Sequence, residues 1–154
     1  MILPDLLKDN LKIVFCGTAA GNKSAERKAY YAGAGNLFYQ TLASCGFTPH
    51  ILKPKEFMEL LQFGIGLIDL VKHHFGMDMD LEQGHYYSKS FEQKILQYQP
   101  HFVCFNGKET AKVYFNFKYT RQVNYGLQEN TIVNTKISVA HSTSLQAIAY
   151  WEES

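Results

Sequence analysis

Three short apolar runs, separated by stretches with helical spacing, constrain the fold of this 154-residue chain more than any other feature. They span residues 12–16, 101–105 and 136–140, and each has the length of a buried strand. Strands that alternate with helices predict a parallel sheet with helices on both faces. We therefore expect an α/β fold, a three-layer α/β/α sandwich with a central, mostly parallel sheet of about four to five strands. The polar turns after the three runs should meet at one edge of that sheet, the default place for a binding site.

Helical patterns and short strands fill the rest of the chain. The clearest helix follows Asn36, whose side-chain oxygen can accept a backbone N–H, and it ends at Gly46. A helix over residues 88–99 should bury Phe91, Ile95 and Leu96. Further helices are expected over 55–62, 108–115 and 145–153, together with a short helix around 5–8, a helical turn over 69–75, and short strands over 63–67 and 122–125. Residues 17–35 form a loop that is too long to be a simple connector.

Composition predicts a globular domain. Hydrophobic residues make up 46% of the chain and charged residues 19%, which excludes a disordered chain, and the length suffices for a real core. With no linker or repeat in view, we expect one domain over residues 1–154. No apolar run reaches the roughly 18 residues that span a membrane, and the N-terminus lacks the build of a signal peptide. We therefore expect a cytoplasmic monomer with no membrane partner.

The formal net charge of +1 gives no independent support for nucleic-acid binding, because proteins that coat DNA are usually more basic. Basic residues do cluster at 23–28, 108–112 and 118–121. Each cluster is either a solvated surface or a patch that contacts phosphate.

The three cysteines, Cys16, Cys45 and Cys104, are odd in number and widely spaced. This pattern predicts buried free thiols in a reducing compartment. Neither the cysteines nor the histidines have the spacing of metal ligands, so we expect no metal and no cofactor.

The stretch over residues 13–49 points most clearly to function. It reads IVFCGTAAGNKSAERKAYYAGAGNLFYQTLASCGFTP. An apolar strand enters a turn bracketed by Gly17 and Gly21, and a second turn with Gly33 and Gly35 leads into a helix. This arrangement is typical of a ligand crevice beyond the end of the first strand of an α/β protein.

The chain resembles the mismatch-specific uracil-DNA and thymine-DNA glycosylase branch of the uracil-DNA glycosylase superfamily. Three blocks carry the resemblance in order: FCGTAAGNKSAERKAYYAGAGNLFYQTL (15–42), FGIGLIDLVK (63–72), and FNGKETAKVYF (105–115) with AHSTSLQAIAYW (140–151). The resemblance covers nearly the whole chain. It implies a DNA-repair glycosylase whose partner is DNA with a uracil or a mismatch. Such an enzyme flips the base, hydrolyses its N-glycosidic bond and leaves an abasic site, with uracil opposite guanine as the first substrate to expect.

The sequence departs from this branch at one important position. Family members typically carry Gly-x-Asn-Pro-Gly in the first block, and that asparagine positions the attacking water. Here the position is Ala19, whose methyl group cannot hydrogen-bond to water. Asp69 is the candidate catalytic replacement, because a carboxylate can stabilise a developing oxocarbenium ion and orient or deprotonate water. The alternative is that Asp69 only caps the following helix.

The resemblance also implies a base pocket at the first block. Tyr31 takes the position of the aromatic residue that stacks on the extruded base, although Tyr31 and Tyr30 could both simply pack in the core. Backbone groups of Gly17, Thr18 and Ala19 could contact the base edge, because small side chains allow a close approach. The Thr18 hydroxyl could add a contact or serve the turn.

The third block would supply the loop that enters the duplex. His141 takes a position from which it could donate to a base carbonyl oxygen, or it is structural. Ser142, Thr143 and Ser144 complete a polar turn, whose serines could donate to flanking phosphates. Leu145 matches an apolar wedge that fills the space of the flipped base, or it is the first buried position of the last helix.

Two functional alternatives stay open. Ala19 and Ala20 leave more room than Asn-Pro, so hypoxanthine, xanthine or thymine could be the substrate on the same scaffold. Loss of the asparagine also allows a catalytically inactive lesion- or nucleic-acid-binding module. Asn106, which ends the second core strand, could shape the pocket or simply make the Asn-Gly turn.

Overall fold

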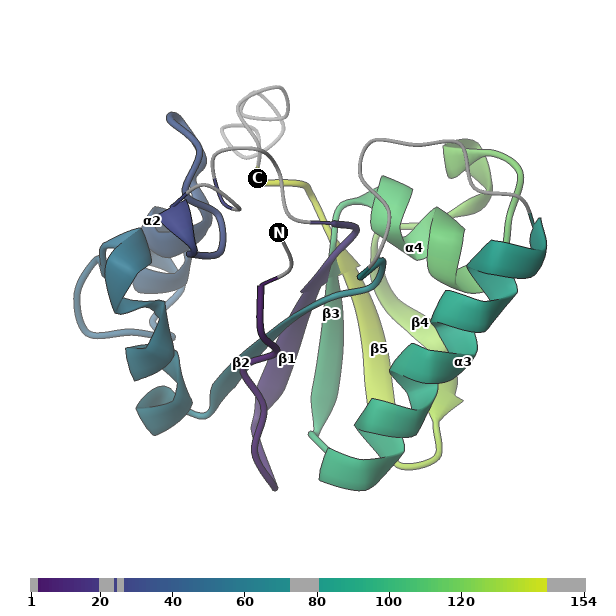
Figure 1. The fold of residues 1–154 in the computed structure, drawn as a ribbon, viewed down its shortest axis with the longest axis horizontal. Coiled ribbons are helices and arrows are strands. Elements are labelled where there is room, and N and C mark those ends of the chain that lie inside the picture. The colour runs from purple at the N-terminus through teal and green to yellow at the C-terminus, as the bar shows by residue number, and fades with distance from the viewer. Residues whose placement is uncertain (1–2, 20–23, 25–26, 73–80, 144–154) are drawn as a thin grey trace.

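A five-stranded sheet forms the centre of the computed structural model, which describes residues 3–19, 24, 27–72 and 81–143 (Figure 1). The strand order is β2-β1-β3-β5-β4, with β4 antiparallel to β5 and all other pairs parallel. The predicted α/β fold with a mostly parallel sheet is therefore confirmed. The strands are β1 (Ile13–Gly17), β2 (Ile65–Asp69), β3 (Phe102–Asn106), β4 (Gly126–Ile132) and β5 (Thr135–Ala140).

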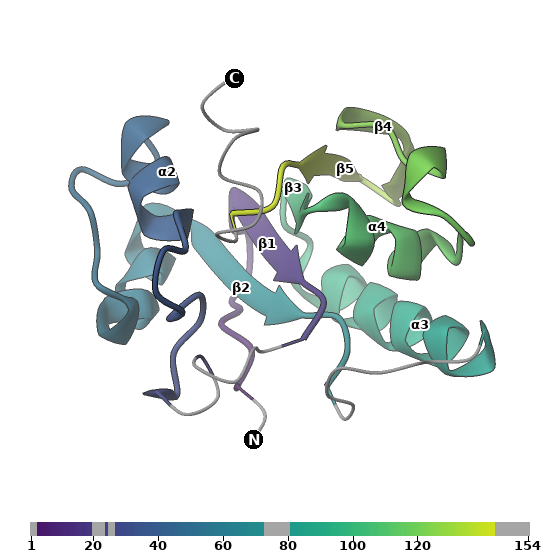
Figure 2. The same cartoon turned by 90° about the horizontal axis from the view of Figure 1, so that it is seen from above.

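Helices cover both faces of the sheet, which gives the expected three layers (Figures 1 and 2). On one side lie α3 (Leu81–Tyr98) and α4 (Lys108–Phe115), and on the other lie α2 (Phe38–Ser44) and the 3₁₀ helix η1 (Pro54–Phe63). No helix of the described residues is long and apolar enough to cross a membrane.

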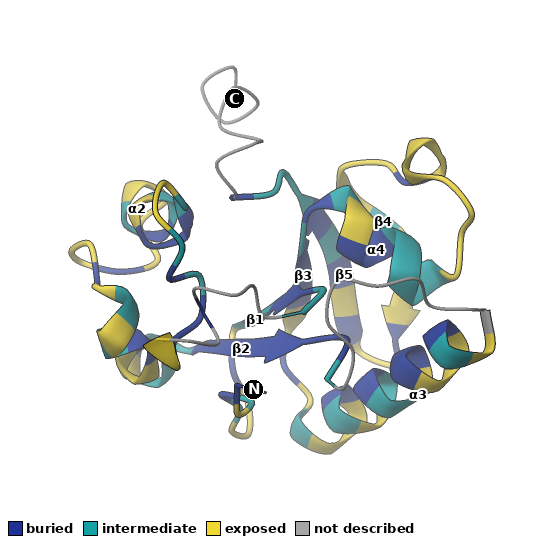
Figure 3. Ribbon diagram, turned by 45° about the horizontal axis from the view of Figure 1, so that its top comes forward, coloured by how far each residue is buried: buried dark blue, intermediate teal, exposed yellow. Residues whose placement is uncertain are grey.

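Successive side chains of β1 pack alternately into two hydrophobic cores, one on each face of the sheet. Val14 and Cys16 pack into the core under α3 and α4. Ile13 and Phe15 pack against the core under α2 and η1. This period of two is the geometry of a strand covered on both faces, and Figure 3 shows the neighbouring strand β2 as buried.

The predicted end of α2 at Gly46 is confirmed, whereas the N-cap position is taken by Leu37 rather than by Asn36. Asn36 Oδ1 accepts the N–H of Phe38, the first helical residue, at 3.0 Å. At the other end Gly46 has a φ of 83°, and its N–H bonds the carbonyl of Ala43 at 3.1 Å. A left-handed residue after the last turn stops the helix and satisfies free carbonyls.

The expected strand over 63–67 was wrong by two residues. Gly64, with a φ of 79°, caps η1, so β2 begins at Ile65 and ends with Asp69. Asp69 is paired in register with Gly17 of β1. The expected helical turn over 69–75 is absent at residues 70–72, and residues 73–75 lie outside the described part.

The N-terminal expectation was also wrong. Residues 5–8 do not form a helix. Instead Leu6 forms an antiparallel bridge with Leu67, and the backbone hydrogen bonds between them measure 2.8 and 3.0 Å. The free edge of β2 can pair with this extended segment, and such pairing outweighs a weak local preference for a helix.

Three further expectations need correction. Helix α3 begins at Leu81 rather than at residue 88, and Leu96 is 44% exposed although Phe91 and Ile95 are buried as predicted. Residues 122–125 are not a strand, because β4 starts at Gly126 after a 3₁₀ turn, η2 (Thr120–Gln122). Cys45 is exposed, whereas Cys16 and Cys104 are buried free thiols. The expected helix over 145–153 lies outside the described residues.

Candidate active site

The turns after β1, β3 and β5 meet at the carboxyl edge of the sheet, as the alternation of strands and helices predicts. Together with the end of β2 they enclose a crevice of about 520 Å³. Sequence-predicted residues that line it are Gly17, Thr18, Ala19, Tyr31, Asp69, Asn106, Ser142 and Thr143.

The turn after β1 is fixed to the residues that follow β2. Leu70 N–H donates to the Gly17 carbonyl at 2.8 Å, and Val71 N–H donates to the Thr18 carbonyl at 2.7 Å. The Thr18 hydroxyl lies 2.7 Å from the Thr110 hydroxyl, which is on α4. Several polar groups expected to contact a base are thus already engaged in holding the turn in place.

Asp69 brings a buried carboxyl group to the floor of this crevice. The residue is only 6% exposed, and its Oδ1 lies 3.1 Å from the position that a Cβ would take on Gly17. Burial raises the pKa of Asp69 to about 6, while the charge of Lys72 lowers it and that of Asp5 raises it. The group can therefore take up and release a proton near neutral pH, which suits a general base.

Lys72 does not neutralise Asp69 fully, because its charge is shared. Lys72 Nζ forms an ion pair with Asp5 at 2.5 Å and donates to the Leu3 carbonyl at 3.2 Å. Lys94 Nζ from α3 pairs with the other carboxylate oxygen of Asp5 at 2.6 Å. This network ties the N-terminal segment to α3 and to the residues that follow β2, and it contains the two charges, Lys72 and Asp5, that act on the pKa of Asp69.

Tyr31 faces Asp69 across Gly17. One face of its ring stacks on Phe38, with ring centroids 4.1 Å apart and planes inclined by 29°. Tyr31 is partly exposed and lines the crevice, while its hydroxyl is buried and lies 3.3 Å from the same Cβ position on Gly17. Burial and then the Asp69 charge raise the pKa of this phenol well above its usual value.

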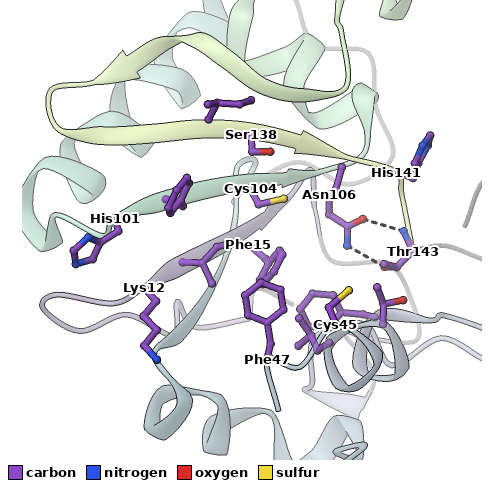
Figure 4. Close-up of a pocket in the computed structure, with 17 residues that line it drawn as sticks. Lys12, Phe15, Cys45, Phe47, His101, Cys104, Asn106, Ser138, His141 and Thr143 are labelled. Carbon is purple, nitrogen blue, oxygen red and sulfur yellow. Dashed lines mark hydrogen bonds between the residues drawn. The ribbon is translucent and has the colours of Figure 1, made fainter. Parts of the chain in front are cut away.

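Asn106 has a role that the sequence did not suggest. Its side-chain amide donates to Thr143 Oγ1 and accepts the Thr143 N–H, both at 2.9 Å (Figure 4). The Thr143 carbonyl accepts the Leu37 N–H at 2.9 Å. The end of β3, the turn after β5 and the start of α2 are therefore locked together. The two partners are 37 residues apart, so only the shared sheet edge could have hinted at the pair.

The predicted duplex-entering loop is only partly brought to the crevice. Ser142 and Thr143 both line the crevice, and Thr143 is 4% exposed and hydrogen-bonded to the Asn106 amide. His141 packs on Tyr125, with ring centroids 3.9 Å apart, and lines the neighbouring groove instead. Ser144 and Leu145 lie outside the described residues.

A second, larger cavity lies on the sheet face beside α2. It measures about 890 Å³ and is lined mainly by apolar side chains, among them Phe15, Phe47 and Phe102 (Figure 4). Asn106 and Thr143 border both cavities. No carboxylate lines the groove among the described residues, so we place the chemistry in the crevice that holds Asp69.

The basic cluster at 108–112 lies beside the crevice. Lys108 lines it and holds its ammonium 4.4 Å from the centre of the Tyr125 ring. Lys112 pairs with Glu109 at 2.8 Å. In the described part of the chain, no three His, Cys, Asp or Glu residues lie close enough together to hold a metal ion.

Comparison with known proteins identifies the family of this chain. The family model of the uracil DNA glycosylase superfamily matches residues 4–153. The chain belongs to the uracil DNA glycosylase superfamily. Members of this superfamily are DNA glycosylases that hydrolyse the bond between base and sugar, which supports a DNA-repair function of this type. The match does not single out the mismatch-specific branch.

A solved structure has the same fold. It is a solution NMR structure of a protein from Methanosarcina acetivorans that is described as a candidate uracil DNA glycosylase. The similarity has a TM-score of 0.61 at 17% identity, and it covers 99% of this chain and 93% of that chain. At this identity the similarity supports the fold alone.

Proposed function

We propose that this protein is a monofunctional DNA glycosylase that removes uracil, first of all from G·U mismatches, and leaves an abasic site. The observation that carries the proposal is the buried Asp69 carboxyl, with a pKa raised to about 6, at the crevice of a superfamily member. The mismatch-specific branch, a monomeric state and a cytoplasmic location belong to the same proposal.

The proposed reaction is a hydrolysis in which Asp69 acts on water. The C1′–N1 bond breaks, its electron pair leaves with the base, and positive charge develops on the sugar. The ionised Asp69 carboxylate stabilises that charge and takes a proton from the water as its oxygen bonds to C1′. The proton then passes to the departing base, so the products are the free base and an abasic sugar.

The other crevice residues hold the flipped base and the DNA. Gly17, Thr18 and Ala19 border the base at the end of β1, and Tyr31, which also lines the crevice, offers its ring for stacking. In this proposal His141 and residues 142–145 form the part that faces the duplex, with Leu145 as the wedge. His141 would contact the base carbonyl only after leaving Tyr125.

A second candidate substrate follows from the Ala19 methyl group that lines the crevice. Because this side chain is smaller than an asparagine, hypoxanthine, xanthine or thymine could enter the same site. The catalytic role of Asp69 would be unchanged.

The test uses labelled oligonucleotides that carry U·G, U·A, T·G, single-stranded uracil or hypoxanthine, followed by alkaline cleavage at abasic sites. We expect the wild type to act fastest on U·G, and Asp69→Asn to slow the single-turnover rate by about 10²- to 10⁴-fold. Asp9→Asn, the same change at an exposed aspartate, should leave the rate unchanged.

Two outcomes would contradict the proposal in different ways. A wild-type protein that binds lesion DNA but cleaves none of these substrates is a binding module. Full turnover by Asp69→Asn would leave the enzyme intact and remove Asp69 from its mechanism.

A further inference from the structure

Within the described part of the chain, the strands β3 and β5 are well covered on only one face of the sheet. On that face their side chains lie in the core under α3 and α4 and are almost fully buried: Val103, Phe105, Ile137 and Val139. Neither strand contributes a described residue to the buried core under α2 and η1. Parallel strands are as a rule buried on both faces, so the second face of β3 and β5 is expected to have a further cover.

This second face is the floor of the large apolar groove beside α2 (Figure 4). Phe102 on β3, Leu127 on β4 and Phe47 after α2 line the groove and are 38, 64 and 42% exposed. Large apolar side chains that are exposed together in one hollow mark an interaction surface. The volume of about 890 Å³ leaves room for several side chains of an occupant.

The charges along the groove indicate what kind of occupant it fits. Lys12 and His101 line it and directly precede β1 and β3, so they lie at the amino end of the sheet. Lys136, near the start of β5, holds its ammonium 5.7 Å from the centre of the Phe102 ring. No Asp or Glu among the described residues lines the groove. A fitting occupant therefore has an apolar face and carries negative charge at the amino end of the sheet.

The segment of residues 144–154, outside the described part, has such a sequence. It reads SLQAIAYWEES, with no Gly, Pro, Lys or Arg. Ile148 and Trp151 are three residues apart and fall on one face of a helix, and Glu152 and Glu153 follow. The segment thus combines an apolar face with a negatively charged end.

The segment also starts at the groove and has a suitable length. Thr143, directly before it, lines the groove at the carboxyl end of the sheet and is held there by the Asn106 amide. A chain that turns back over β5 from this point runs toward the amino end. A helix over residues 145–153 is about 14 Å long, and a strand of the length of β3 spans about 15 Å. The far end of such a helix therefore reaches the basic side chains.

We propose that residues 144–154 dock as a helix in this groove and form the cover of β3 and β5. The apolar face of the segment lies against Phe102 and Leu127. Its two glutamates lie toward Lys12 and His101. The inference goes beyond the proposed function and does not depend on it, because it concerns the packing of the sheet and not the chemistry of the crevice.

The first test uses Trp151, the only tryptophan of the chain. At concentrations where sedimentation shows a monomer, its emission should lie at a shorter wavelength than in the urea-unfolded protein, with several-fold less quenching by acrylamide. Leu127→Glu places a charge in the groove and should remove both effects. Met58→Glu is the matched control, because Met58 lies on η1, outside the groove, and is 67% exposed. It should leave the emission unchanged.

The second test approaches the contact from the segment. Ile148→Glu should have the effect of Leu127→Glu, whereas Gln146→Glu, on the opposite side of the expected helix, should have none. The exposed thiol of Cys45 lines the groove and gives a second readout. Its reaction with a disulfide reagent should become several-fold faster in the two disruptive variants. Cys16, buried in the core on the other face, should stay unreactive as long as the fold is kept.

Three outcomes would overturn the proposal. One is a wild-type emission that matches that of the unfolded protein. Another is a short-wavelength emission that neither Leu127→Glu nor Ile148→Glu changes, because Trp151 would then be buried somewhere else. The third is burial that appears only at concentrations where the protein dimerises, which would assign the groove to a second copy. A wild type that releases no base would refute the proposed function and leave the docking as it is, since neither readout needs activity.

Discussion

The buried carboxyl of Asp69 should make the fold less stable at neutral pH, and its removal should stabilise it. In the folded state the pKa of Asp69 is raised to about 6, whereas the ordinary pKa of an aspartate is 3.8. The unfolded chain therefore releases this proton more readily, so stability falls as the pH rises from about 4 to about 6. Below that window the penalty vanishes.

The size of this penalty follows from the two pKa values. The difference between 3.8 and about 6 corresponds to about 3 kcal/mol at pH 7, at 1.36 kcal/mol for each pH unit. Asp69→Asn removes the charge but keeps a polar amide in the same buried place, which still costs desolvation. We therefore expect Asp69→Asn to raise the free energy of unfolding by about 2 kcal/mol at pH 7.5.

The assay is urea unfolding followed by circular dichroism at pH 7.5 and at pH 4.5. Comparing the variant with the wild type at each pH cancels the titration of all other groups. The stabilisation should shrink markedly at pH 4.5, and Asp9→Asn should show no such dependence. If Asp69→Asn is equally stable relative to wild type at both pH values, then Asp69 does not carry the raised pKa and the reasoning fails.

Two further variants test how the crevice and the sheet are held. Asn106→Ala leaves the Thr143 N–H and hydroxyl without their partners, so it should destabilise the fold by about 1–3 kcal/mol and weaken binding to lesion DNA. Chemical unfolding measures the stability and fluorescence anisotropy measures the DNA binding. Asn124→Ala is the control at an exposed asparagine. An unchanged unfolding midpoint would show that the clamp contributes little. Gly66→Ala should lower the free energy of unfolding by about 1–3 kcal/mol, because its Cβ would lie 2.7 Å from both the Leu6 carbonyl oxygen and a Leu11 methyl carbon. Gly33→Ala is the control, because a Cβ at Gly33 meets nothing within 4 Å. Wild-type thermal stability of Gly66→Ala would mean that the N-terminal segment moves aside freely.

The parts of the fold that sequence patterns predict well are those with buried periodicity. Helix α4 has the bounds that were expected, and β1, β3 and β5 lie within one residue of the predicted runs. Each of these elements packs several of its side chains in the core and is bounded by a turn residue such as Gly107. The meeting of their turns then follows from parallel topology alone.

The elements that were missed lack such a pattern. Only Ile132 of β4 is buried, so its sequence shows no alternation. Gly64 fits either a strand or a helix cap, and only its left-handed backbone decides between them. The bridge between Leu6 and Leu67 depends on contacts far apart in the chain, which no local pattern contains.

The candidate site also has a part that the sequence predicts and a part that it does not. Its place at the sheet edge follows from strand order, but the role of Asp69 came from the family resemblance and not from any spacing. The Asn106–Thr143 clamp and the opposition of Tyr31 and Asp69 arise only when the chain folds. The left-handed backbone of Tyr31 has no sequence signature, because tyrosine does not favour it.

The pH dependence of base release is the most direct test of the central claim that the Asp69 carboxylate drives hydrolysis. Single-turnover rates on U·G duplex should rise with pH through a midpoint near 6, because only the ionised group can accept a proton from water. In Asp69→Asn the rate should be low and should show no step in that range. A wild-type step that persists unchanged in Asp69→Asn would contradict the account.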